Sequence, residues 1–303
     1  MLGAVNSRAQ PPPLRAGNLV MHFGLRPYLM GIVNVTPDSF SDGGRFFDRQ
    51  RAVEHALALV EQGADILDIG GESTRPGSDP VPASAEIDRV VPVIEDVVRW
   101  AATPISIDTT KAAVARAALD AGATLVNDVS ALRFDPEMAG TVAAAGVPLV
   151  LMHMRGTPKT MQQGQIVYGD LLGEIAGFLA GRIQQARQAG IAAERIIVDP
   201  GIGFGKTAEH NLSIIHRLGE LAALGRPVLL GVSRKAFIGQ VLDVPVEQRV
   251  FGTAAAVAAG VLAGAHIIRV HDVAPMRQVA LLAQAIANES LPAAPGRASG
   301  ERP

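Results

Sequence analysis

The sequence contains no cysteine, so disulfide bonds and thiolate metal sites are excluded. This absence also fits a reducing compartment. Neither sign of charge is in large excess, because 27 Lys and Arg residues face 29 Asp and Glu residues, which gives a net charge of −2. A basic nucleic-acid-binding surface is therefore not indicated. Any anionic ligand must be bound by positive groups gathered locally.

Long apolar runs are missing as well. None reaches the roughly 18 residues that span a membrane, which argues against a membrane partner. The first segment, MLGAVNSRAQPPPLRAG, lacks the apolar core of a signal peptide, and the sequence therefore predicts a cytoplasmic protein. Residues 1–17 and 291–303 are rich in proline, glycine, serine and charge, which predicts disordered tails on either side of one domain at 18–290.

Short apolar strands alternate with helical segments through this domain. The strand-like runs are LMGIVNV, DILDIGG, PISIDTT, TLVNDVS, PLVLMH, RIIVDPG, PVLLGVS and HIIRVHD. Alanine-rich segments with helical periodicity, such as 49–62, 84–100, 111–121 and 170–189, lie between them. This alternation implies parallel strands with right-handed crossovers. Eight such units predict an α/β fold, a single closed (β/α)8 TIM barrel. The segment LVMHFGLRPYL before the first strand predicts a small hairpin that closes the barrel floor.

Polar residues gather where the predicted strands end. They are Asn34, Glu72, Asp108, Asn127, Asp128, His153, Asp199, Ser233, Arg269 and His271. The carboxyl ends of barrel strands converge on one face, and active sites of such barrels lie there. The sequence therefore predicts one polar cup at this face, with the loop TPDSFSDGG as part of its rim.

Two segments, MGIVNVTPDSFSDGG and DIGGESTRPGS, resemble the signature segments of the dihydropteroate synthase family. SIDTT, VNDVS, LMHMRGTPKTMQ, DPGIGFGK, GVSRKAFIG and RVHDV follow in that family's order, so the resemblance covers roughly residues 26–287. It implies a transferase that joins (7,8-dihydropterin-6-yl)methyl diphosphate to 4-aminobenzoate. The products are 7,8-dihydropteroate and diphosphate, in tetrahydrofolate biosynthesis. The family is a sulfonamide target and is typically homodimeric.

The resemblance also implies which residues bind the pterin and its diphosphate. They are Asp108, Asn127, Val129, Met152, Asp199, Lys235, Arg269, Val270 and His271. Five of these are expected to act in catalysis, namely Asp108, Asp199, Lys235, Arg269 and His271. A dissociative path is expected, because the electron-rich dihydropterin can delocalise the positive charge that remains when diphosphate leaves.

The second substrate and a metal ion complete the expected site. By the same resemblance, 4-aminobenzoate is bound by Phe40, Thr74, Arg75, Pro76, Phe204 and Ser233. The departing diphosphate needs positive charge, and Mg2+ commonly binds oxygen ligands together with substrate phosphates. The resemblance implies that Asn34 is the Mg2+ ligand, and Asp38 or Asp42 is expected to be added once the first loop closes.

Two other functions remain open from the sequence. A pterin-binding methyltransferase barrel would share the acid and amide residues but would not need STRPG or SRK. A non-catalytic folate-binding paralogue would not need the first loop. GIGFGK resembles a phosphate-binding loop, but its spacing is wrong for one. The segment VFGTAAAVAAGVLAGA is apolar around most of its circumference, which favours burial against a second copy of the chain.

Overall fold

Eight parallel strands form the centre of the computed structural model, which describes residues 10–36 and 44–291. The strands are β3 (Tyr28–Asn34), β4 (Ile66–Gly70), β5 (Ile105–Asp108), β6 (Leu125–Asp128), β7 (Leu149–Met152), β8 (Ile196–Asp199), β9 (Leu229–Leu230) and β10 (Ile267–Val270). They pair in the order β8-β7-β6-β5-β4-β3-β10-β9, and a parallel bridge between Val198 and Val228 joins the two ends. The predicted (β/α)8 barrel is confirmed.

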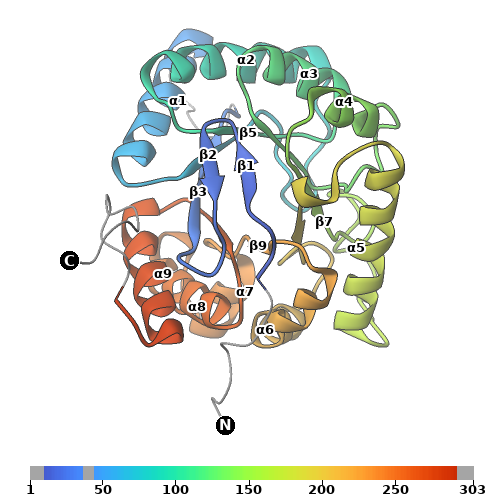
Figure 1. Ribbon diagram of the computed structural model, residues 1–303, viewed down its shortest axis with the longest axis vertical. Helices are drawn as coiled ribbons and strands as arrows, with labels where there is room; N and C mark the ends of the chain where they lie inside the picture. Colours follow the sequence, from blue (N-terminus) through green and yellow to red (C-terminus); the bar gives the residue numbers. More distant parts are fainter. Residues whose placement is uncertain (1–9, 37–43, 292–303) are drawn as a thin grey trace, which may run out of the picture.

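Helices surround the strands as an outer ring (Figure 1). They are α1 (Gly44–Glu61), α2 (Ala83–Trp100), α3 (Ala112–Asp120), α4 (Met138–Ala145), α5 (Leu171–Gln188), α6 (Ala208–His216), α7 (Ala236–Leu242), α8 (Val250–Leu262) and α9 (Val273–Asn288). The connections of the described segments also contain the short 3-10 helices η2 (Ala193–Arg195), η3 (Leu218–Leu224) and η4 (Val246–Gln248). In α2, Val90, Val93, Ile94 and Val97 are buried at the spacing of one helix face, which packs this helix on the barrel.

The strands separate two layers of apolar side chains, because successive residues point to opposite faces. In β4, Leu67 and Ile69 belong to the large core between strands and helices. Ile66 belongs instead to a smaller core inside the barrel, together with Met30 and Val150. This inner core fills only the lower part of the barrel. The interior above it is left to polar residues.

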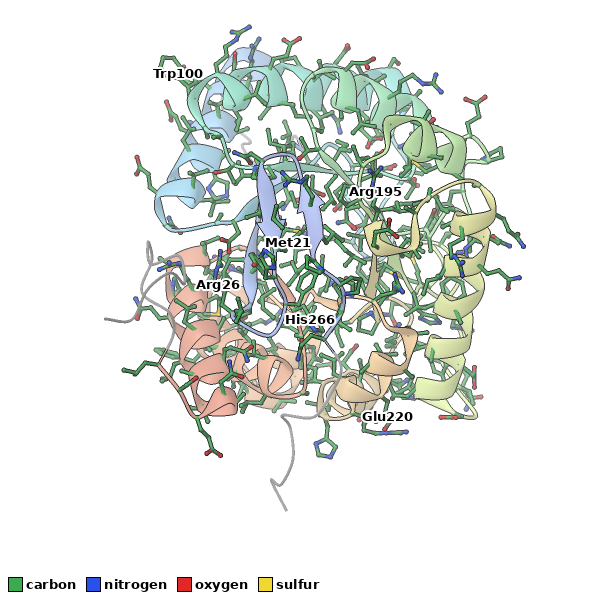
Figure 2. All side chains as sticks on the ribbon, in the orientation of Figure 1. Met21, Arg26, Trp100, Arg195, Glu220 and His266 are labelled. Carbon is green, nitrogen blue, oxygen red and sulfur yellow. The ribbon has the colours of Figure 1, made fainter. Side chains whose placement is uncertain are left out.

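A hairpin covers the lower end of the barrel. Its strands are β1 (Leu14–Ala16) and β2 (Leu19–Met21), and they lie in front of the barrel strands in Figure 1. Leu14 and Met21 are buried in the inner core, and Met21 lies near the centre of Figure 2 whereas the exposed Trp100 lies at its edge. The hairpin shares residues 19–21 with the predicted one. Its first strand, however, lies in the segment predicted as a tail, because Leu14 and Ala16 alternate inward.

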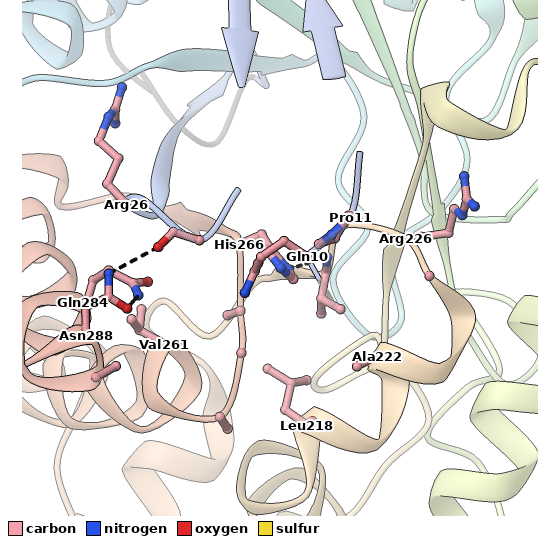
Figure 3. A pocket seen from close by; sticks show the side chains of 18 residues that line it. Gln10, Pro11, Arg26, Leu218, Ala222, Arg226, Val261, His266, Gln284 and Asn288 are labelled. Atoms are coloured by element: carbon pink, nitrogen blue, oxygen red, sulfur yellow. Dashed lines mark hydrogen bonds between the residues drawn. The ribbon is translucent and has the colours of Figure 1, made fainter. Parts of the chain in front are cut away.

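A small pocket of about 70 Å³ lies at the same end of the barrel (Figure 3). Asn288 at the end of α9 donates a hydrogen bond to the Gly24 carbonyl at 3.1 Å. The Val228 amide donates to Nδ1 of His266 at 3.1 Å, and burial lowers the pKa of His266 to about 4, so the ring is neutral and can accept. The first bond joins α9 to the segment between β2 and β3, and the second joins the residues that precede β9 and β10. Within the described ranges, no helix is long and apolar enough to cross a membrane.

We expect Gly201→Ala to lower the free energy of unfolding by about 1–3 kcal/mol or more, because its backbone is strained for other residues. Gly201 has φ +72°, and a Cβ there would overlap the carbonyl oxygen of His153. Gly181→Ala on the exposed side of α5 is the matched control, since a Cβ there meets nothing within 4 Å. The control should gain about 0.5–1 kcal/mol. Denaturant unfolding measures both, and equal stabilities would contradict the assignment of strain.

Candidate active site

The carboxyl ends of the strands surround a cavity of about 780 Å³, which we call the cup. Its volume lies within the range of small-molecule sites. Among the predicted site residues, the cup is lined by Asn34, Thr74, Arg75, Asp108, Asn127, Val129, Met152, Asp199, Phe204, Ser233, Lys235, Arg269 and His271. Strands far apart in the sequence therefore contribute to one site, as predicted from their polar ends.

A buried ion-pair group lies at the bottom of the cup. Nε of Arg269 donates to Oδ2 of Asp68 at 2.5 Å, and Nη2 of Arg269 donates to Oδ2 of Asp108 at 2.7 Å. Asp68 is fully buried in the middle of β4. Burial opposes the charge on Arg269, but the two carboxylates outweigh it and raise the pKa of the guanidinium above its usual value. Arg269 is therefore a permanent cation fixed at two points.

Two carboxyl groups of the cup have raised pKa values. Burial raises the pKa of Asp108 to about 7, against the opposing effect of Arg269. Burial also raises the pKa of Asp199 to about 6, although the Gly201 amide donates to its Oδ1 at 2.6 Å and Lys235 lies nearby. Buried carboxylates of this kind gain stability when a ligand donates hydrogen bonds to them. The pair is suited to a flat ring that carries N–H donors.

Lys235 and an apolar cluster form another wall. Nζ of Lys235 lies 4.4 Å from the centre of the Phe204 ring. Burial lowers the pKa of Lys235 to about 8, with Arg269 contributing. Val129, Met152 and Phe204 pack together in a buried cluster with two further methionines. Apolar side chains beside a few directed polar groups are typical of a site that binds a planar heterocycle.

Ser233 and His271 are hydrogen bonded to each other at the rim. Oγ of Ser233 lies 2.9 Å from Nδ1 of His271 and accepts from the His271 amide at 3.2 Å. Burial lowers the pKa of His271 to about 3, and the nearby Arg269 acts in the same direction. His271 is therefore a neutral ring that can exchange hydrogen bonds, whereas Arg269 is a fixed cation.

The loop after β4 is held by a chain of charged groups. Nζ of Lys111 lies 2.6 Å from both Glu72 Oε2 and Glu86 Oε2, and Glu86 on α2 is fully buried. The other oxygen of Glu72 accepts from the Val81 amide at 2.7 Å. Both ends of the segment that carries Thr74 are thereby fixed to the barrel. The loop therefore presents its residues to the cup from a supported position.

Some predicted site residues lie elsewhere. Val270 is buried in the core between strands and helices, because strand alternation turns it outward when Arg269 faces the cup. Pro76 is exposed and is not among the residues that line the cup. Phe40, Asp38 and Asp42 fall in 37–43 and lie outside the described residues.

Asn34 is the predicted metal ligand that the structure describes. It is half-buried at the end of β3 and lines the cup. Its amide oxygen fits one ligand position of Mg2+, an ion that usually keeps several waters and shares substrate phosphates. In the described part of the chain, no group of three or more His, Cys, Asp or Glu residues is placed to hold a metal.

Two functional residues were not predicted from the sequence. Asp68 has a visible signal, because a carboxylate stands between Leu67 and Ile69 in the strand run DILDIGG. Lys206 is buried, with Nζ 2.9 Å from Nδ1 of His153 and 3.1 Å from the Phe204 carbonyl oxygen. Burial lowers the pKa of Lys206 to about 7 and that of His153 to about 3. This lysine ties the loop that carries Phe204 to the end of β7.

Comparisons with known proteins agree with this geometry. Residues 30–271 match the model of the family described as pterin binding enzyme. The chain is 48% identical over 277 residues to the dihydropteroate synthase of Synechocystis sp., covering 91% of this chain and 96% of that one. It is 46% identical over 261 residues to the dihydropteroate synthase of Bacillus subtilis, covering 86% and 89%.

Solved structures give the same result. Xanthomonas albilineans dihydropteroate synthase with 4-aminobenzoic acid is 46% identical with a TM-score of 0.85, covering 91% of this chain and 98% of that one. A Yersinia pestis dihydropteroate synthase in a sulfonamide drug complex is 42% identical with a TM-score of 0.86, covering 91% and 100%. The barrel and its cup thus define a pterin-binding enzyme, and the chain belongs to that family. Within the family it groups with the dihydropteroate synthases.

Lys206 generates a prediction about pH. Its pKa of about 7 in the folded protein lies below the ordinary lysine value of 10.5, so folding releases a proton between these values. The unfolded chain then binds more protons, and wild-type stability gains from Lys206 as pH rises through this window. Lys206→Met lacks this gain. The stability of the variant relative to wild type should therefore fall between pH 7 and 10.5.

Urea unfolding at several pH values measures this difference directly. Lys159→Met is the matched control, because Lys159 is exposed and paired only at the surface with Asp79. A difference between wild type and Lys206→Met that stays constant across the window would show that Lys206 folds without losing its proton.

Proposed function

We propose that the protein catalyses the dihydropteroate synthase reaction in the cup. It transfers a 7,8-dihydropterin-6-ylmethyl group from its diphosphate to the amine of 4-aminobenzoate, a step of tetrahydrofolate biosynthesis. The observation that carries the proposal is the half-buried Arg269 held by Asp68 and Asp108, beside Asp199 and Lys235. This set combines hydrogen-bond acceptors for a ring with fixed positive charge for a diphosphate.

The pterin ring is proposed to lie deep in the cup. Asp199 accepts from the ring N–H and the exocyclic amine, and Lys235 donates to a ring nitrogen or carbonyl oxygen. Asn127 adds an amide to the same recognition. Val129 and Met152 pack against the ring face, which removes apolar surface from water. Raised carboxyl pKa values support this placement, because donors of the ring replace the lost hydration.

The chemical step is proposed to be dissociative. The carbon–oxygen bond to diphosphate breaks with its electron pair on the diphosphate, where Arg269 stabilises the developing negative charge and His271 can hydrogen bond. The cation left on the pterin methyl carbon is stabilised by Asp108 and Asp199. The arylamine nitrogen then forms the new bond and releases its proton to solvent. Charges held in fixed positions near the reacting atoms are thus proposed to supply most of the rate enhancement.

Mg2+ is the proposed cofactor. Asn34 would hold it, with Asp38 or Asp42 as further ligands from the first loop, and it would supply positive charge to the leaving diphosphate. A cytoplasmic location is proposed, consistent with the absence of cysteine from the sequence. The proposed partners are the two small-molecule substrates, and neither nucleic acid nor a membrane is required.

The second substrate is proposed to bind between the loop after β4 and the rim. Ser233 hydrogen bonds its carboxylate, Phe204 packs on its ring, and Thr74 and Arg75 orient it from the supported loop. Phe40 and Pro76 remain proposed contacts. The presence of this loop in the cup favours a synthase, because a methyltransferase barrel would not need the STRPG residues that the loop carries. Sulfonamides, which resemble 4-aminobenzoate, are proposed to compete for the same place.

Diphosphate release, measured with and without 4-aminobenzoate, tests the function. We expect release to require the dihydropterin diphosphate and to accelerate strongly with the arylamine.

Asp199→Asn should weaken pterin binding by about tenfold or more, since an amide donor then faces ring donors at a cost of about 1–3 kcal/mol. Asp88→Asn, the same change on the exposed side of α2, is the matched control.

The outcomes separate the candidate functions. A non-catalytic folate-binding protein would bind the pterin and release no diphosphate. Arylamine-independent release would argue against transfer to 4-aminobenzoate. Affinity of Asp199→Asn within threefold of wild type would remove Asp199 from the pterin site.

A homodimer is proposed from the exposed side of α8. Phe251 is 83% exposed, and Ala255 and Ala259 are exposed one and two turns further along the same face. On the neighbouring α9, Leu282 and Ile286 are 63% and 60% exposed. Apolar side chains that recur on two packed helices are typical of a protein interface. A second copy of the chain is the proposed partner.

We expect light scattering to give a mass of about twice 31.6 kDa for the wild type at micromolar concentration. Phe251→Glu should give a folded monomer, because a charge in an apolar interface is strongly unfavourable. Trp100→Glu is the control, since Trp100 is 76% exposed on α2 and lies at the edge of the molecule in Figure 2. A monomeric wild type would refute the interface.

A further inference from the structure

Asp68 is an unusual residue for the interior of a barrel. It lies in the middle of β4, fully buried, and pairs in register with Ser106 on β5. Below it, Ile66 belongs to the inner apolar core. A carboxylate at such a position is costly unless hydrogen bonds and opposite charge compensate for its lost hydration. Its partners therefore indicate why it is there.

One oxygen of Asp68 has two partners. Oδ2 accepts from Nε of Arg269 at 2.5 Å and from Nδ2 of Asn127 at 3.1 Å. The contact with Asn127 is buried and joins β4 to β6. A carboxylate can only accept hydrogen bonds, so the asparagine atom that faces it must be the NH2 group.

This contact settles an orientation that is otherwise ambiguous. The two ends of an asparagine amide have nearly the same shape, and only their hydrogen-bond partners distinguish them. Because the NH2 group of Asn127 is directed to Asp68, its carbonyl oxygen is available to the cup, which Asn127 lines. The guanidinium of Arg269 is oriented as well, because Asp68 and Asp108 accept hydrogen bonds from two different nitrogens of it.

We propose that Asp68 is a positioning residue that fixes the Asn127 amide with its carbonyl oxygen toward the ligand, and thereby selects a pteridine that carries a 2-amino group. The inference rests on the proposed pterin function of the cup. A 2-amino group donates to the asparagine oxygen, whereas a 2-oxo group places oxygen against oxygen. Asp68 itself touches neither the ring nor the reacting atoms.

A merely structural role of Asp68 makes a different prediction. If the residue only balanced the charge of Arg269, its loss would weaken the binding of all pteridines in proportion. Loss of amide orientation instead lets Asn127 turn its NH2 group to the cup and accommodate a 2-oxo ring. The ratio of the affinities for a 2-amino and a 2-oxo pteridine therefore distinguishes a positioning role of Asp68 from a merely structural one. An overall loss of affinity does not distinguish them.

The experiment measures Kd values of full-length variants for two probes, 2-amino-4-oxopteridine and 2,4-dioxopteridine, by calorimetry. Wild type should prefer the amino ring. Asp68→Leu, which has a similar volume without acceptors, should reduce this preference by about tenfold. Asp68→Asn should restore it, because its carbonyl oxygen can accept from Arg269 and Asn127, whereas its NH2 group in that place would face two donors.

Ser106→Ala is the matched control, since Ser106 is buried beside Asp68 on the neighbouring strand. It should leave the preference unchanged. A folded Asp68→Leu with the wild-type ratio would overturn the proposal, and so would a folded Asp68→Asn that has lost the preference. If Asp68→Leu does not fold, Asp68→Asn alone decides. A wild type that binds neither probe would instead contradict the proposed pterin function.

Discussion

The cup depends on the guanidinium of Arg269, which two carboxylates from other strands hold in the barrel interior. Arg269 comes from β10, Asp68 from β4 and Asp108 from β5, so the pairing of β10 with β3 and the curvature of the sheet bring them together. Asp68 is fully buried and its charge would be strongly unfavourable without Arg269, so the ion pairs depend on one another. A site built in this way is ordered before any ligand arrives. Its charges need little rearrangement during the reaction, and preorganised charge is the largest contribution in many enzymes.

Burial raises the pKa values of acidic groups in the cup and lowers that of a basic one, and both shifts favour the neutral form. The pKa values of Asp108 and Asp199 are raised to about 7 and about 6, while that of Lys235 is lowered to about 8. Each group is therefore sensitive to a ligand that supplies the missing partner. A ring with N–H donors stabilises the carboxylates, and an acceptor atom of the same ring stabilises the charged lysine. Recognition of the donors and the acceptors of the ring thus uses the same physical effect with opposite signs.

The sequence predicted the fold and the gathering of polar residues at one face, whereas the roles of those residues stay predictions. Strand runs alternating with helical segments predicted the barrel, and polar residues at strand ends predicted the cup, because both signals are local. Asp68 was missed although a carboxylate within an apolar strand run was visible, because its partner Arg269 lies 201 residues away. Val270 was placed in the site by resemblance, although strand alternation next to Arg269 already turns it outward. The start of the hairpin at Leu14 depended on a tertiary contact with the inner core.

The inner core and the cup divide two tasks within one barrel. Apolar side chains such as Met30, Ile66 and Val150 fill the lower interior, and the outer helices bury the other faces of the strands. Burial of these two apolar layers stabilises the fold, and this offsets the cost of polar atoms in the upper interior that lack a hydrogen-bond partner. Within the described residues, Oδ1 of Asp68, Oδ1 of Asp108 and Oγ of Ser106 are buried without a hydrogen-bond partner. Such atoms are rare in proteins and costly, and they concentrate where a function requires them. At Asp108, which lines the cup, a donor on a bound ring would remove that cost, so part of the binding free energy comes from defects that the folded barrel already contains.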